Sequence, residues 1–166
     1  MVAAAEHGAG PHHRAPARRP VRLAAFVAAT ALLLYAGQKA YMAVRGEIGM
    51  PASPAPDWVQ AQHQHPALEQ AGNAALGVMT AMLALATITR WGSRIPRWLL
   101  LRSLAVASVL LSMGAAVDIW RMGRDPDNPT ATAVLEAAWT VVQIAAWFVV
   151  VFSYALRTRP TRDVLR

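Results

Sequence analysis

The amino-acid sequence predicts an all-α fold: a polytopic membrane protein with four transmembrane helices in an up-down antiparallel bundle. Three observations predict it, namely an apolar composition, four apolar runs of spanning length, and an uneven distribution of arginine. Of the 166 residues, 55% are hydrophobic and only 15% are charged. A soluble domain typically carries about 25% charged residues, so the composition favours a chain whose solvent is lipid.

Four segments have the length that a bilayer requires. A helix needs about 20 mostly apolar residues to cross a hydrocarbon core of about 30 Å, and such runs occupy residues 23–44, 70–89, 98–118 and 131–156. In lipid every backbone N–H and C=O must be paired internally, and the alternating pattern of a β-barrel does not occur in these runs, so each is expected to be helical. The sequence therefore predicts one transmembrane domain over residues 21–157.

The segments outside the runs are polar or rich in proline. Residues 1–20 are expected to be a disordered basic tail, and residues 158–166 a second basic tail. The connection over residues 45–69 holds four prolines, which favours an extended or turning chain. Within it, Gly46 and Gly49 permit a tight turn just outside the membrane, and Pro51 stops any continuing helix.

The basic residues indicate the orientation. Twelve of the 16 Lys and Arg residues fall in the two tails and in the connection between the second and third helices, with their flanks. The other four are Lys39, Arg45, Arg121 and Arg124. Because Lys and Arg in short loops are retained in the cytoplasm, this split predicts a multi-pass plasma-membrane protein with both termini cytoplasmic. The charge is then explained by topology and by attraction to anionic lipid, and nucleic acid is excluded as a partner.

One alternative for the first helix stays open. A basic start, an apolar run and small residues near Ala36 and Gly37 also fit a cleaved secretory signal. The run is long enough to span, which favours a retained helix.

The residues that support common enzyme chemistry are missing. Without cysteine the chain has no disulfide and no thiolate metal site. His63 and His65 offer two metal ligands with no second pair nearby, which is too few for a site. A glycine-rich phosphate loop and a nucleophile-base pair are also not found. We therefore expect no catalytic residues, no metal and no cofactor.

A polar cluster is expected near the outer ends of the helices. Lys39 and Glu136 each lie five residues from the outer boundary of their run, which places both about 7 to 8 Å deep. A charge facing lipid at that depth costs a few kcal/mol, so the two side chains should face each other or water. The full cluster is Gln38, Lys39, Asn73, Asp118 and Glu136. It is interpreted either as an ion-paired clasp that fixes neighbouring helices or as a pocket for a small polar ligand.

Small residues recur at four-residue spacing, which lets helix backbones approach closely in lipid. The sets are Ala25 with Ala29, Gly77 with Ala81, and Ser108 with Ser112 and Ala116. We expect them to pack the helices of one chain together rather than to form a dedicated oligomerisation face.

The segment from Tyr41 to Pro51 resembles the exit from the first helix in a family of small four-helix membrane proteins of actinobacteria, classed as a domain of unknown function. Their pattern is Tyr-Trp-Ala-x-Gly-Gly-x-Trp-Gly-x-Pro. The matching residues are Tyr41, Ala43, Gly46, Gly49 and Pro51, while Met42 and Ile48 replace tryptophans and Arg45 replaces a glycine. The resemblance implies the same four-span plan and an actinobacterial source, and it implies no activity.

These observations predict a non-enzymatic accessory component of the membrane, which acts through contacts with another membrane protein, with itself or with lipid. The alternative is a small transporter or channel for an ion or polar metabolite that uses the polar cluster. An enzyme acting on a lipid or quinone ranks third.

Overall fold

The described part of the chain is helical apart from one short β-hairpin and the connecting turns. The computed structural model describes residues 17–51, 53–124 and 131–158, and for residues 53, 118–124 and 131–137 it describes the backbone course alone. The elements in order are α1 Arg19–Arg45, β1 Gly49–Met50, β2 Ser53–Pro54, α2 Asp57–Gln60, α3 Pro66–Ala86, the 3-10 helix η1 Trp91–Arg94, α4 Arg97–Arg124 and α5 Ala131–Arg157.

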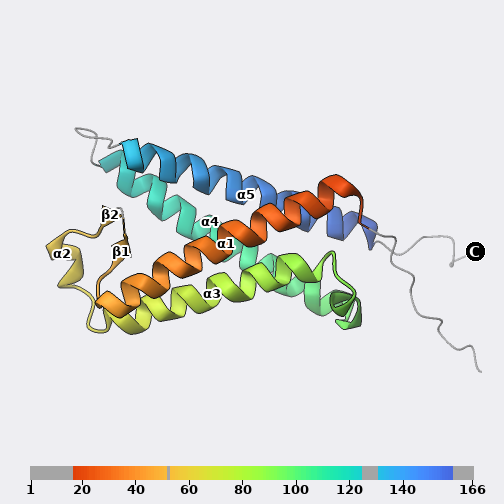
Figure 1. Ribbon diagram of the computed structural model, residues 1–166, viewed down its shortest axis with the longest axis horizontal. Helices are drawn as coiled ribbons and strands as arrows, with labels where there is room; N and C mark the ends of the chain where they lie inside the picture. The colour runs from red at the N-terminus through yellow and green to blue at the C-terminus, as the bar shows by residue number, and fades with distance from the viewer. Residues whose placement is uncertain (1–16, 52, 125–130, 159–166) are drawn as a thin grey trace, which may run out of the picture.

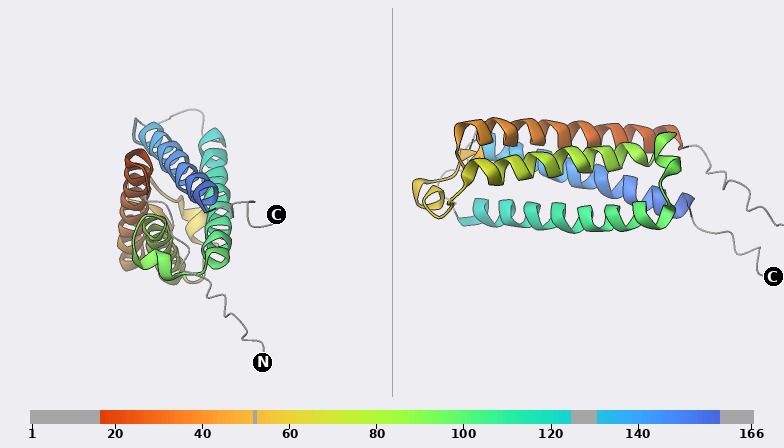
Figure 2. Two further views of the ribbon diagram at one scale, coloured as in Figure 1. Left: turned by 90° about the vertical axis from the view of Figure 1, so that its right-hand side faces the viewer. Right: turned by 90° about the horizontal axis from the view of Figure 1, so that it is seen from below.

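The helices α1, α3, α4 and α5 lie lengthwise along the molecule (Figures 1 and 2). The start of α1, the α3–α4 connection with η1, and the end of α5 lie together at one end, which we call the arginine end. The β-hairpin and α2 lie at the opposite end, which we call the hairpin end. A hydrogen bond from Arg157 Nη2 to the Thr87 carbonyl, 3.4 Å, ties the end of α5 to the end of α3.

Three helical segments are long and apolar enough to cross a membrane: Arg19–Arg45, Arg97–Val117 and Ala138–Arg157. The helix α3 has 21 residues but is not in this set, and Glu69, Gln70 and Asn73 near its start lower its hydropathy. Length and composition therefore support three of the four predicted spans, and the fourth stays a prediction.

Two prolines begin helices that the sequence analysis started later. The helix α1 begins at Arg19 rather than at Leu23, with Pro20 in its first turn. In the same way α3 begins at Pro66 rather than at Gln70. Proline is accepted in a first turn because the N–H it lacks has no partner there. The predicted tail is therefore two residues too long at Arg19 and Pro20; its residues 1–16, and residues 159–166 of the other tail, lie outside the described part of the chain.

The other helix ends differ by a few residues. The helix α3 ends at Ala86 rather than Thr89, α4 continues to Arg124 rather than ending at Asp118, and α5 spans Ala131–Arg157. The α3–α4 connection depends on Gly92, where an added Cβ would come within 1.8 Å of the Ala86 carbonyl oxygen. Only glycine fits this turn, because backbone atoms occupy the place of a side chain.

The helices α1 and α3 pack closely through small side chains. A Cβ added at Gly77 would lie 3.0 Å from Ala36 Cβ and 3.2 Å from the Leu32 carbonyl oxygen. Ala25, Ala29 and Ala81 are buried as well. The two predicted small-residue sets on α1 and α3 are thus confirmed as packing positions within the chain.

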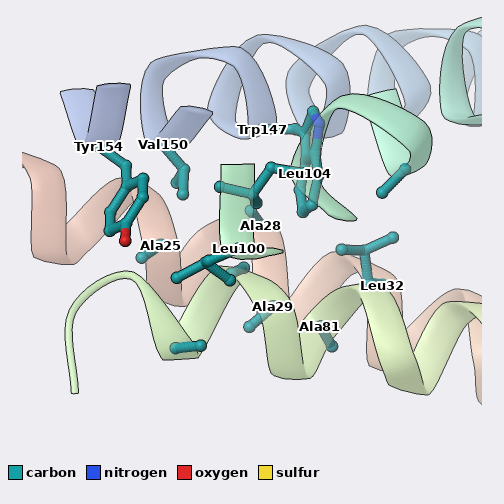
Figure 3. Packing of buried hydrophobic residues seen from close by; sticks show 13 residues of the cluster. Ala25, Ala28, Ala29, Leu32, Ala81, Leu100, Leu104, Trp147, Val150 and Tyr154 are labelled. Carbon is teal, nitrogen blue, oxygen red and sulfur yellow. The ribbon is translucent and has the colours of Figure 1, made fainter. Parts of the chain in front are cut away.

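The contact between α4 and α5 depends on large side chains. Trp147 of α5 is fully buried, and Leu104 of α4 lies beside it in the core (Figure 3). The indole Nε1–H of Trp147 donates to Ser108 Oγ at 2.8 Å, and Ser108 in turn donates to the Leu104 carbonyl at 2.8 Å. Of the third small-residue set only Ser108 makes this contact, while Ser112 and Ala116 are exposed.

The outer surface of these helices is strongly apolar. Large hydrophobic side chains are exposed along each of them, including Leu34 on α1, Met79 on α3, Val106 on α4 and Phe152 on α5, at 54 to 62% exposure. In the most apolar stretch of each of the three segments named above, only 22 to 33% of the residues are buried inside the chain. Such a surface is expected where lipid takes the place of water.

Candidate functional site

The hairpin end holds the richest set of polar contacts in the described part of the chain. It begins where α1 stops at Gly46, whose φ of 69° is left-handed. The N–H groups of Gly46 and Glu47 cap the last turn by donating to the carbonyls of Ala43 and Met42, each at 3.2 Å. Gly49 also has a positive φ, 120°. The predicted turn at Gly46 and Gly49 is thus confirmed, because both backbones adopt conformations that favour glycine.

The described residues between α1 and α3, 46–51 and 53–65, form a structure that we call the cap. In it β1 and β2 pair as an antiparallel hairpin, followed by the single turn of α2. The Gln60 amide holds the hairpin to α2: its Oε1 accepts from the Ile48 N–H at 2.7 Å, and its Nε2 donates to the carbonyls of Ile48 and Ala55 at 2.9 and 3.2 Å. One side chain therefore satisfies three backbone groups, which orders a connection that carries little apolar core of its own.

Two helices hold the cap through one carbonyl. Lys39 Nζ of α1 donates to the Gly49 carbonyl at 2.8 Å, and Gln70 Nε2 of α3 approaches the same oxygen at 3.4 Å. The Lys39 ammonium also lies 5.5 Å from the centre of the Tyr35 ring, a cation–π distance. The β-hairpin is thus anchored to both α1 and α3 by polar side chains at the ends of those helices.

The predicted polar cluster is described only in part. Lys39 and Asn73 are half-buried at the hairpin end and Gln38 is exposed. The side chains of Asp118 and Glu136 lie outside the described part of the chain, so the Lys39–Glu136 pair stays a prediction. The contact that the structure does describe joins Lys39 to the cap.

Two glutamines carry this site although the sequence analysis did not single them out for it. Gln70 was taken as the first residue of an apolar run, yet it is 1% exposed and its Oε1 is a buried acceptor without a hydrogen-bond partner. Gln60 was placed in a loop. The Gln70 partner is a backbone atom at a sequence separation of 21, which no local pattern reveals.

Charged side chains at the hairpin end form local pairs. Arg45 and Glu47 make a salt bridge with Nη2 and Oε1 2.8 Å apart, and both side chains are exposed, so it contributes little stability. His63 Nδ1 contacts Glu69 Oε2 at 2.5 Å. Among the described residues, no group of three or more His, Asp or Glu side chains could hold a metal ion.

The surface of the cap is hydrophobic in places. Trp58 in α2 is 66% exposed and Leu68 at the start of α3 is 71% exposed. A shallow hollow of about 430 Å³ lies between the end of α1 and the start of α3. Its lining is Gly46, Gln64, His65, Pro66, Ala67 and Leu68. An ordered loop with an exposed indole offers a contact surface that is held in place before a partner arrives.

Comparisons with protein-family models, with curated proteins and with solved structures give no match to this chain. Nothing in them bears on the resemblance of Tyr41 to Pro51 to the actinobacterial family, which stays a prediction.

Proposed function

We propose that this chain is a non-enzymatic accessory protein of the plasma membrane, which acts by contact of its cap with a second membrane protein. In this proposal α1, α3, α4 and α5 all cross the bilayer, in up-down order and with both termini in the cytoplasm. The observation that carries it is the ordered, polar-anchored cap beyond helices whose faces are apolar.

Two features support the four-span arrangement. The helix α3 lies alongside α1 over most of its length (Figure 2), so a bilayer that covers α1 also covers the exposed apolar residues of α3. The described arginines of the two chain ends and of the α3–α4 connection gather at one end of the molecule, as they do when short basic loops stay in the cytoplasm.

The cap supports an interaction role because its order comes from dedicated contacts. Lys39, Gln60 and Gln70 are used to hold backbone groups of the cap. A linker that only joins two helices needs no such anchoring. The exposed Trp58 then supplies the apolar, rigid contact that interfaces favour.

The proposal is tested by purification from native membranes in a mild detergent. We expect a stoichiometric membrane-protein partner with the wild type and its loss with Trp58→Ala. Trp91→Ala is the matched control, because Trp91 is also exposed, at 43%, but lies in η1 at the arginine end. Recovery of the wild type as a clean monomer, or equal loss with both variants, would contradict the proposal.

A second candidate, transport of a small ion or polar metabolite, is favoured by one observation. The buried Gln70 Oε1 has no hydrogen-bond partner, and Lys39 lies close to the same Gly49 carbonyl. A passing polar ligand could use this acceptor. Transport predicts that Lys39→Met abolishes uptake or efflux in cells while the protein still inserts, whereas an anchor for the cap predicts a lower melting temperature in detergent and no change in flux.

A further inference from the structure

The two ends of the molecule differ in the balance of their charges. Among the side chains that the structure describes, the acids are Glu47, Asp57 and Glu69, and all three belong to the hairpin end. The described basic residues of the arginine end are Arg18, Arg19, Arg22, Arg90, Arg94, Arg97, Arg102 and Arg157. Within the described part of the chain, these arginines therefore have no carboxylate nearby to neutralise them.

Three of these arginines lie near the turn from η1 into α4, which we call the corner. The 3-10 helix η1 ends at Arg94 and α4 begins at Arg97, so Arg94, Arg97, Trp98 and Arg102 lie within one short stretch of the chain at this corner. The Arg102 guanidinium lies 5.1 Å from the centre of the Trp98 ring, one turn closer to the end of the helix. Side chains on a helix tilt toward its N-terminus, and the N-terminus of α4 is at the arginine end. Arg102 therefore reaches toward the membrane surface rather than into the bilayer.

The corner has the two properties that a lipid headgroup requires. Trp98 is 58% exposed, and an exposed indole at a helix end lies at the level of the headgroups. Arg97 is half-buried, and its Nε is a buried donor without a hydrogen-bond partner in the structure. A guanidinium that is partly removed from water and not paired with a carboxylate matches the paired oxygens of a phosphate.

We propose that Arg94, Arg97, Trp98 and Arg102 bind the phosphate of an anionic phospholipid headgroup in the cytoplasmic leaflet. This inference rests on the membrane placement of the proposed function, but it does not depend on a partner at the cap. The phosphate accepts from the three guanidinium groups, and the indole packs against the glycerol region. Zwitterionic lipids carry the same phosphate but also a cation that the arginines repel, so the corner prefers the anionic class.

The test is a titration of the purified full-length protein with phosphatidylglycerol or phosphatidylcholine in mixed micelles. The amount of bound lipid is measured by native mass spectrometry, and the melting temperature of the protein is measured at each lipid concentration. The variant is Arg97→Gln with Arg102→Gln. The matched control is Arg18→Gln with Arg19→Gln, which removes the same charge from exposed positions at the same end. Each basic side chain near a membrane surface contributes roughly fivefold in affinity, so two that contact the headgroup contribute about 25-fold together. We therefore expect phosphatidylglycerol binding to fall about tenfold or more in the corner variant and by a clearly smaller factor in the control, whose arginines do not contact the headgroup in this proposal.

Equal weakening by the two variants would overturn the site and leave only general attraction between the arginines and the lipid. The same rise in melting temperature with inorganic phosphate alone would also overturn it, because the ligand would then be a free anion. The single variant Arg102→Gln, at an exposed position, gives the same comparison if the double variant does not fold. A wild type that resists carbonate extraction from membranes but shows no preference for phosphatidylglycerol overturns the lipid site alone, and one that carbonate extracts overturns the membrane placement of both proposals.

Discussion

The α1–α3 pair and the α4–α5 pair pack by different means. In α1–α3, Gly77 faces Ala36 and the Leu32 carbonyl at distances that leave no room for a further methyl group without adjustment. In α4–α5, the fully buried Trp147 fills the space between the helices and is held by its hydrogen bond to Ser108. The first pair thus depends on small residues and close backbones, and the second on one large side chain with a polar partner.

The difference shows two ways to stabilise a contact between apolar helices. Lipid is as apolar as leucine, so burial of an apolar side chain between two helices is not driven by water, and packing and hydrogen bonds must stabilise the contact. A glycine lets backbone atoms of two helices gain dispersion contacts directly. A tryptophan gains the same contacts with its ring, and its N–H must then find an acceptor.

The largest effect is expected for Trp147→Ala. The substitution leaves a cavity between α4 and α5 and is expected to cost about 3 kcal/mol or more in the free energy of unfolding. The measurement is unfolding in mixed detergent micelles followed by circular dichroism. Trp139→Ala on the same helix is the control, because Trp139 is 43% exposed. Similar losses in the two variants would show that Trp147 does not fill the α4–α5 contact.

A smaller effect is expected for Gly77→Leu, which forces a branched side chain against Ala36 and the Leu32 carbonyl. Overpacking of this kind costs about 2 kcal/mol. Gly72→Leu is the matched control on α3, since nothing lies within 4 Å of a Cβ added there. If the melting temperature of the Gly77→Leu protein equals that of the control, the close approach of α1 and α3 is refuted.

The smallest effect is expected for Ser108→Ala, which removes the acceptor of the Trp147 N–H. Hydrogen bonds between membrane helices are worth about 0.6 kcal/mol on average. The control is Ser112→Ala, one turn along α4 at an exposed position. A double-mutant cycle with Trp147→Phe measures the coupling of the two side chains. A coupling near zero would show that the hydrogen bond does not stabilise the contact between α4 and α5.

The long helices and the turn after α1 were predictable because they depend on interactions between residues close in sequence. The apolar runs gave the places of all the long helices to within a few residues at most ends, because a spanning helix must be continuous in lipid. Gly46 and Gly49 were predictable as turn residues, since few other residues adopt a left-handed backbone. The errors at Arg19 and Pro66 arose because a proline ends a helix in most positions but starts one in the first turn.

The candidate site was harder to predict because its contacts are not local. Lys39 was identified from its depth in an apolar run, but its described partner is the Gly49 carbonyl, which becomes available only when the hairpin folds back over α1. Glutamine is common in loops and on surfaces, so the sequence does not single out Gln60 or Gln70. Their roles depend on which backbone groups of the cap still need a hydrogen-bond partner once the hairpin has formed.

By itself the sequence determined that this chain is helical, that its long helices are rich in apolar residues and that its arginines are unevenly distributed, because each of these follows from the chemistry of single segments. Only the tertiary structure decided that Gly77 meets Ala36, that Trp147 donates to Ser108, and that Lys39 and Gln70 share one carbonyl. Those contacts join residues far apart along the chain, and their geometry is set when the helices pack against one another.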